Sequence, residues 1–244
     1  MDYKSKLLSM VLTAVVLTFV IPFYIDIPWQ AWFIIPFLCY LTKGIGSEIG
    51  AHRLWAHYSF DTSNFYKKIM IALQTLAGEG SIIAFAGVHR LHHRYSDTDK
   101  DPHSPKNNLL GTIFYHYEVK EFNPRLIKDL IVDKWLVIQH RQYFNIQLIL
   151  AILLLLISPL WLWLYAVNIL STLWINFLVN VVCHRWGTNA NGLDNSSKNN
   201  SWADIFLLGV GLHNNHHKDP GAYDLAWKPN QFDVWAKIIK IIKK

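Results

Sequence analysis

The chain has 244 residues, of which 52% are hydrophobic, 14% are aromatic and only 16% are charged. That balance is typical of an integral membrane protein rather than a soluble one, and the length suits a single domain. The net charge of +6 does not indicate a nucleic-acid partner, because the lysines and arginines form no basic stripe interleaved with aromatic residues. Cys39 and Cys183 lie in apolar segments and form no Cys-x-x-Cys pair, so the sequence shows neither a disulfide framework nor a thiolate metal site.

Four apolar segments predict membrane-spanning helices, because a helix of about 20 apolar residues crosses the hydrocarbon core. Their approximate ranges are 7–25, 29–50, 144–167 and 170–186. The first is not a signal peptide, because no small-residue cleavage site follows it and further apolar spans do. The second is apolar only as far as Thr42, and we expect it to continue as a helix out of the membrane toward His52. Asn168 and Ile169 leave almost no loop between the last two spans.

The remaining segments, 51–143 and 187–244, are predicted to form a cytosolic cap. Lys67–Val88 is apolar but interrupted by polar residues and glycines, which favours a helix lying in the membrane interface, or packed under the cytosolic domain, over a crossing. We expect a soluble helix from Pro124 to Tyr143 and a last helix from about Gln231. The expected fold is an all-α integral membrane protein in which residues 1–244 form one domain, with four transmembrane helices beneath a helical cap.

The placement of charge predicts the orientation. With four crossings and both termini on one side, the outer loops are 26–28 and 167–169, and neither contains a lysine or an arginine. All 23 lysines and arginines then lie on the side of the termini, which the positive-inside rule makes cytoplasmic. We therefore expect a multi-pass protein with both termini and the histidine-rich segments in the cytoplasm.

Eight of the twelve histidines fall in three short segments, GAHRLWAH, HRLHH and HNNHH. Residues three and four apart share a helix face, so one turn of HRLHH could offer three imidazoles to one metal centre. His52 and His57 are five apart, about 140° on a continuous α-helix, so either the helix ends between them or they serve different metals. An isolated histidine is more often structural than a ligand. Because one zinc needs about four ligands, eight clustered histidines suit two ions better than one.

Asn180 and His184 are four residues apart at the cytosolic end of the last predicted span. Polar groups inside a membrane are costly and usually functional. A hydrogen bond between helices explains this pair equally well, so on their own the two residues leave both interpretations open.

The segments GAHRLWAH, HRLHHRYSDTDKDPH and HNNHH, together with the Asn-x-x-x-His of the last span, resemble the membrane-bound acyl-CoA desaturases of the stearoyl-CoA type. The likeness extends from about Trp29 to near the C-terminus. It implies a four-span fold under a cytosolic helical cap, and a non-haem di-iron centre in which Asn180 holds a metal-bound water. The implied ligands are His52, His57, His89, His92, His93, His184, His213, His216 and His217. His103, His116 and His140 match no ligand position, and we expect them in loops or on the surface.

The resemblance also implies an activity: insertion of a cis double bond, at the Δ9 position, into a saturated long acyl chain with O2 as co-substrate. The chain would lie in a dry apolar tunnel bent at the irons. Two electrons are needed, and the sequence contains neither a cytochrome b5-like HPGG nor a cysteine cluster for iron–sulfur. We therefore expect a separate donor protein of the cytochrome b5 or ferredoxin type.

This chain departs from the family pattern at positions that concern the head group. Val210 stands where a glutamate is usual, and Gly87 stands where animal members carry an arginine thought to help hold CoA. Acyl-CoA is the first expectation, and an acyl-lipid or acyl-carrier protein remains an alternative. The small size and short termini are more typical of a bacterial member, so we expect an inner-membrane location.

Tyr40 is a candidate for the closed end of the tunnel. It lies about 16–18 Å before the first histidine at roughly 1.5 Å per helical residue, where family members close the tunnel at the methyl end of the chain. If this is right, Tyr40→Ala should lengthen the preferred substrate. A tyrosine facing lipid or the membrane interface is an equally good interpretation.

Two other functions deserve comparison. Histidine-rich di-iron membrane hydroxylases share scattered histidine segments but not the HRYSDTDKDPH continuation. A non-enzymatic metal transporter would place its ligands near the middle of the bilayer, whereas these histidines gather at the predicted cytosolic edge.

Overall fold

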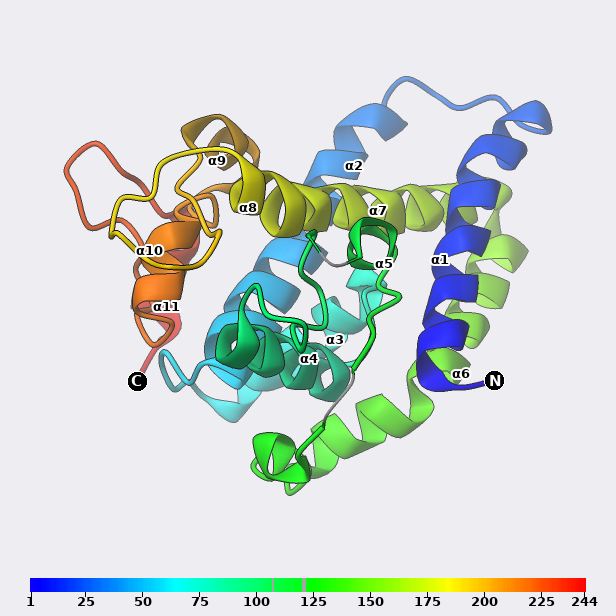
Figure 1. Ribbon diagram of the computed structural model, residues 1–244. Coiled ribbons are helices and arrows are strands. Elements are labelled where there is room, and N and C mark those ends of the chain that lie inside the picture. Colours follow the sequence, from blue (N-terminus) through cyan, green and yellow to red (C-terminus); the bar gives the residue numbers. More distant parts are fainter. Residues whose placement is uncertain (107, 120–121) are drawn as a thin grey trace.

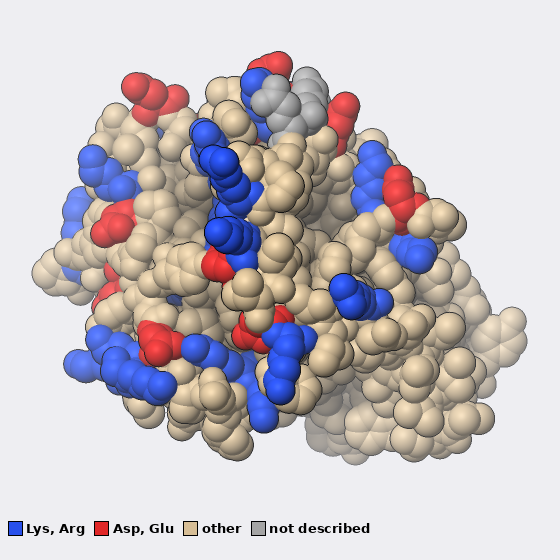
Figure 2. Space-filling model, turned by 90° about the horizontal axis from the view of Figure 1, so that it is seen from below, with Lys and Arg blue, Asp and Glu red and all other residues tan. Residues whose placement is uncertain are grey.

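The computed structural model describes residues 1–106, 108–119 and 122–244. Within these residues the regular structure is helical, with three isolated β-bridges (Figure 1). Both termini lie in the lower half of the view in Figure 1, and the link between the first two helices lies at the upper edge. Lysines and arginines are spread over the lower face, interspersed with acidic residues (Figure 2).

Three helices are long and apolar enough to cross a membrane. The first joins α1 (Tyr3–Val20) to the 3₁₀ turn η1 (Ile21–Phe23), and the second is α6 (Lys134–Ile157). The third runs without a break through α7 (Pro159–Phe177), η4 (Leu178–Val182) and α8 (Cys183–Arg185). Asp2 and Asp133 cap α1 and α6 by accepting hydrogen bonds from backbone N–H groups of the first turn. The first predicted span, 7–25, falls on α1 and η1.

The predicted break at Asn168 is wrong, and α6 and α7 are separated at Ser158 instead. The Ser158 hydroxyl accepts a hydrogen bond from the Leu160 N–H, and Pro159 occupies the first position of α7, where a missing N–H costs nothing. Asn168 is buried inside α7 and donates to the Leu76 carbonyl at 3.1 Å. An amide that looked like a loop residue therefore joins two helices.

The second predicted span, 29–50, is part of a continuous helix made of α2 (Ala31–Cys39) and η2 (Tyr40–Ala56). This helix is not among the three that are apolar enough to cross. In η2 the backbone forms i→i+5 hydrogen bonds, which gives a wider turn than an α-helix has. Most of η2 is buried, and a Cβ atom at Gly46 would overlap the backbone of Gln74, so glycine is needed where η2 meets the next helix.

The single interfacial helix expected over 67–88 is wrong. The chain forms α3 (Asn64–Ala77) and α4 (Ile82–Tyr95), with axes bent by 83°. The bend is possible because Gly78 and Gly80 adopt positive φ angles of 78° and 97°, which glycine reaches without a steric penalty. Counted as one broken span, this pair would be a fourth crossing.

The other helices are short. They are α5 (Leu109–Ile113), η3 (Pro124–Ile127), α9 (Ser201–Leu207), α10 (His213–Lys218) and α11 (Val234–Ile242). The helix expected over 124–143 is therefore η3 followed by the start of α6. The largest apolar cluster packs η2, α3 and α4 against α9 and α11, and the buried Arg53–Asp233 ion pair, 2.9 Å long, ties η2 to the start of α11. The elements that carry histidines thus rest on the most buried part of the chain.

Candidate metal centre

Nine histidine side chains converge on one region from η2, α4, α8 and α10. Their ligand nitrogens form two adjacent groups. In the first group, His52, His57, His89 and His216 place these atoms within 4.8 Å of one another. His93 joins it, because its Nε2 lies 3.1 Å from His89 Nε2 and 2.8 Å from His216 Nε2.

The second group contains His92, His184, His213 and His217, again within 4.8 Å of one another. The Nε2 atoms of His184 and His213 are 2.9 Å apart, and those of His213 and His217 are 3.2 Å apart. The two groups touch, because the rings of His93 and His217 stack with centroids 4.4 Å apart. The residues therefore divide into five plus four.

The three imidazoles of HRLHH divide between the two adjacent groups. His89 and His93, four apart on α4, face the first group, and His92 faces the second. On an α-helix a residue three positions on is displaced by about 60° to one side, and a residue four positions on by about 40° to the other. The segment on α10 does the converse: two of its histidines enter the second group and His216 enters the first.

His52 and His57 belong to the same group although they are five residues apart. Of the two alternatives, the first is confirmed, because η2 ends at Ala56 and His57 is its C-cap, and the second is wrong for this pair. The last turn has the wider i→i+5 pattern of η2, since the His57 N–H donates to the His52 carbonyl at 3.1 Å. In such a helix, residues five apart lie one turn apart. The ring centroids of this pair are 5.0 Å apart.

Three of the imidazoles make a hydrogen bond through Nδ1, on the side of the ring that faces away from the group. His52 donates to Glu48 Oε2 at 3.1 Å, and His184 donates to the Ser196 hydroxyl at 2.9 Å. Ser196 in turn donates to Asp97 Oδ1 at 2.7 Å. Such contacts fix the ring orientation and leave Nε2 with a lone pair facing the group.

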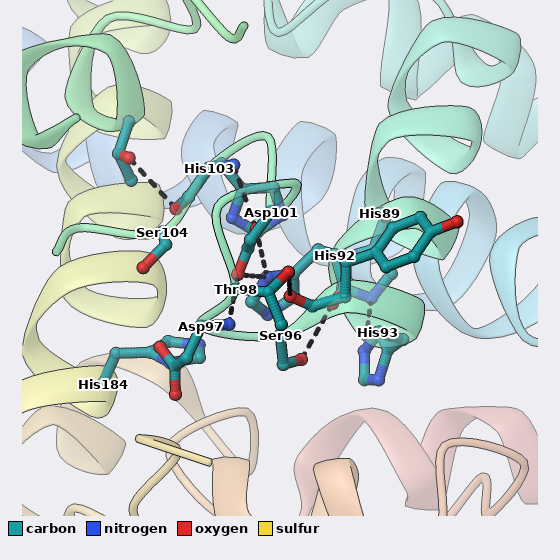
Figure 3. Close-up of polar contacts among 12 residues, drawn as sticks. His89, His92, His93, Ser96, Asp97, Thr98, Asp101, His103, Ser104 and His184 are labelled. Carbon is teal, nitrogen blue, oxygen red and sulfur yellow. Dashed lines mark hydrogen bonds and ion pairs between the residues drawn. The ribbon is translucent and has the colours of Figure 1, made fainter. Parts of the chain in front are cut away.

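The third contact is the most elaborate, and Figure 3 shows it. His92 Nδ1 lies 2.9 Å and 3.0 Å from the two carboxylate oxygens of Asp101. The same oxygens accept the backbone N–H groups of Asp97, at 2.9 Å, and His103, at 3.1 Å. The loop after α4 therefore folds around Asp101, whose carboxylate orients His92. Burial raises the pKa of Asp101 to about 6.

This donor set fits metal ions. Where Nδ1 carries the proton, the facing Nε2 atoms are acceptors only, and acceptors about 3 Å apart repel one another unless a cation lies among them. Burial also lowers the pKa of His213, His216 and His217 well below the usual histidine value, so these imidazoles are neutral at pH 7. Neutral imidazole is the form that binds iron, zinc, copper or nickel.

A cavity of about 410 Å³ adjoins the histidines. His52, His89 and His213 form part of its wall, as do Asn180 and Val210. The cavity is of the size that holds small ligands. Asn180 is partly exposed to this space.

His103 lies in the loop after α4, in agreement with the expectation of a loop or surface position, but it is not on the surface. It is buried, lines the same cavity and stacks on His92 with centroids 4.0 Å apart. Its burial lowers its pKa to about 3, so the ring is neutral. His116 and His140 belong to neither group, and His140 Nδ1 instead contacts the Ser81 hydroxyl at 2.7 Å.

Comparison with known proteins assigns this arrangement to a family. The model of the fatty acid desaturase family matches residues 27–227. The chain belongs to the fatty acid desaturase family. Its histidine groups lie within the matched region, and the predicted enzyme class, an oxidoreductase that desaturates fatty acids, is confirmed at the level of the family.

Individual relatives of this desaturase differ in the carrier of the acyl chain that their names give. The sn-1 stearoyl-lipid 9-desaturase of Anabaena variabilis is 32% identical over 78% of this chain and 72% of its own length. The protein of the same name from Synechocystis is 30% identical over 78% of this chain and 61% of its own. Bovine stearoyl-CoA desaturase 5 is 29% identical, over 78% of this chain and 62% of its own length. The chain thus spans between 61% and 72% of these relatives.

Sequence reasoning found the histidines of this desaturase but not the groups behind them. Asn214 and Asn215 anchor α10, since their amides donate to the carbonyls of Ser197 at 3.0 Å and Leu225 at 2.9 Å. The acidic residues that follow HRLHH were the signal for Asp101, because a carboxylate beside a histidine segment is a common partner of Nδ1. No local signal pointed to Ser196, which the fold brings back from a distant loop.

Proposed function

We propose that this chain is a non-haem di-iron desaturase that introduces a cis double bond at the Δ9 position of a saturated long-chain acyl group. The two adjacent groups of converging imidazole nitrogens carry this proposal. A histidine donor set does not select iron over zinc or copper. Iron is favoured by the reaction that the family name describes, since removal of hydrogen from a saturated chain needs an oxidant that no side chain supplies.

The histidines would divide between the two ions as the groups do. The first ion would be held by His52, His57, His89, His93 and His216. The second would be held by His92, His184, His213 and His217, with a water molecule hydrogen-bonded by Asn180 beside it. When bound, the two irons would activate O2 with two electrons from a separate donor protein of the cytochrome b5 or ferredoxin type.

The other residues of the chain bind and orient. The cavity beside the histidines would hold the acyl chain and exclude water from it, with mainly apolar surfaces such as Phe85, Val179 and Val210 against the methylenes. Glu48 and Asp101 keep the protons of His52 and His92 on Nδ1, so that both rings present a lone pair toward the metal.

An acyl chain esterified in a membrane lipid is the proposed substrate, and acyl-CoA is the alternative. Three observations favour the lipid. Two of the relatives are named as stearoyl-lipid desaturases, and Gly87 lacks the side chain that would help hold CoA. The mouth of the cavity also includes Asp2 and Lys4, at the start of the first apolar helix, where a lipid could enter sideways.

The proposed topology places both termini and the histidines in the cytoplasm of a multi-pass protein, in a bacterial inner membrane. This topology counts the apolar part of α2 as a crossing beside the three long apolar helices. The sequence has no lysine or arginine in 7–42 or 142–184, so the moved break at Ser158 then leaves the charge argument unchanged.

The test is to express the chain and its His93→Ala variant, with a compatible donor, in a host that lacks its own desaturase. Gas chromatography with double-bond mapping should show monounsaturated chains that disappear in the variant. Hydroxylated lipids would instead favour the hydroxylase. Folded protein with bound iron but no lipid change would contradict the proposal and favour a non-enzymatic role such as metal transport. Supplying membranes with labelled phospholipid or labelled acyl-CoA then separates the two carriers.

A further inference from the structure

A buried group of ionised and polar side chains forms part of the cavity wall. Lys43 on η2 is 2% exposed, and Glu79 in the bend between α3 and α4 is 4% exposed. Lys43 Nζ lies 2.9 Å from Glu79 Oε2 and 3.1 Å from Glu48 Oε1. Asn176 donates to Glu79 Oε2 at 2.8 Å and also hydrogen-bonds the Tyr115 hydroxyl. We call Lys43, Glu79, Asn176 and Tyr115 the inner polar wall.

The exposure of the lining residues gives the cavity a direction. Asp2, Lys4 and Val119 are exposed and mark its mouth. The inner polar wall is buried, as are His52, His213 and Val210, and together these residues form the closed part of the cavity. An acyl chain whose head group stays at the mouth therefore points its methyl end into this closed part, which the inner polar wall helps to form.

A second hollow of about 630 Å³ shares no lining residue with the cavity of the histidines. Tyr40 lines this second hollow and not the cavity. On three segments a residue of the second hollow shortly precedes a residue of the inner polar wall: Tyr40 before Lys43, Ile113 before Tyr115, and Ile175 before Asn176. The inner polar wall thus follows the lining of the second hollow on three segments of the chain, and we take it as the boundary between the two spaces.

An alkyl chain could cross this boundary only by displacing hydrogen bonds of ionised groups, and it could replace none of them. Leaving a buried charge unpaired costs more than burying a few methylenes returns. We propose that the inner polar wall, rather than Tyr40, stops the methyl end of the acyl chain and sets the longest chain accepted. This inference rests on the proposed function.

The direct test removes both charges of the wall. In the double variant, the amide of Glu79→Gln still hydrogen-bonds Ser47 and Asn176. Lys43→Met puts an apolar side chain in place of the ammonium. The host fed with saturated fatty acids of increasing length should then yield relatively more of the longer unsaturated products. The ratio of the next longer to the preferred product should rise about tenfold, the discrimination that a hydrophobic pocket achieves per methylene.

Two control variants test whether the protein folds and where the methyl end of the acyl chain is stopped. Lys67→Met with Asp61→Asn removes an exposed ion pair, 2.7 Å long, and should keep the wild-type product ratio. Asn176→Leu leaves the Lys43–Glu79 pair intact and should shift the ratio in the same direction by less, which keeps the proposal testable if the double variant does not fold.

The outcomes separate the hypotheses. Unchanged ratios in folded, metal-loaded wall variants overturn the inference, and so does a shift caused by Tyr40→Ala alone. If the wild-type chain makes no unsaturated product under the same conditions, the proposed function and this inference fail together. If it does make product, an unchanged ratio in the variants refutes only the inner polar wall.

Discussion

Asp101→Asn should weaken one metal site and spare the other. The carboxylate holds His92 Nδ1 and also accepts the N–H groups of Asp97 and His103. An asparagine has one acceptor oxygen, so its NH2 group must face one of these donors, and at least one charge-assisted hydrogen bond is lost. Such a bond contributes about 1.5–3 kcal/mol. That corresponds to about 10–100-fold in metal affinity, the usual effect of removing such a partner.

The effect should be confined to the second group because of what Asp101 supports. Its oxygen holds the backbone of Asp97, whose carboxylate accepts from Ser196, and Ser196 in turn accepts from His184. Two of the four histidines of the second group thus depend on this loop. Within the described residues, the carboxylate of Asp101 contacts His92, Asp97 and His103, none of which belongs to the first group.

The assay is metal content per chain at increasing chelator concentration. The variant should lose one ion at about 10–100-fold less chelator than the wild type, and the other ion at the wild-type concentration. Asp129→Asn is the matched control, because Asp129 pairs at 2.8 Å with Arg90 outside the two histidine groups. Release of both ions in parallel, or no change in either, would refute the reasoning.

Three further outcomes follow from the contacts. Glu48→Gln should lower the metal affinity of the first site by about 10–100-fold and spare the second, the opposite of Asp101→Asn, in the same chelator titration. Asp233→Asn leaves the buried Arg53 charge without its partner, which should cost about 3–5 kcal/mol and lower the melting temperature, followed by tryptophan fluorescence, on the order of 10 °C; an unchanged melting temperature would contradict a structural role for the pair. Gly78→Ala places a Cβ at a φ of 78° against a packed isoleucine, so the melting temperature should fall. A fall smaller than that caused by an alanine substitution at an exposed position would disprove the need for glycine at the bend.

The parts of the site that were predictable are local in the sequence. The spacing of HRLHH and HNNHH determines which histidines share a helix face, so it indicated a metal centre without any knowledge of the fold. What spacing alone did not reveal is that each segment divides between two groups, because that depends on where the facing helix lies. The common group of His52 and His57 required the wider turn of η2, which packing of the buried helix imposes and composition does not signal.

The prediction of the helix boundaries was wrong for a different reason. Ser158 and Pro159 are a recognisable helix start, but the apolar residues on both sides read as one span and the asparagine at 168 looked like the better break. Burial decides the matter, since Asn168 finds partners on two neighbouring helices that the sequence does not show. His103 lies in a loop, as the sequence indicated, but its burial was not predictable, because loop residues are usually exposed and this loop turns inward around Asp101.

The division of the histidines links the two metal sites to each other. Because α4 and α10 each contribute to both groups, neither group can be complete unless both helices are in place. The helix α10 has only six residues, too few to be stable alone, so its position depends on its contacts. Asn214 and Asn215 provide contacts on one side and the imidazoles face the metals on the other. Metal binding and the order of the C-terminal segment are therefore expected to be coupled, with each ion favouring the arrangement that the other one needs.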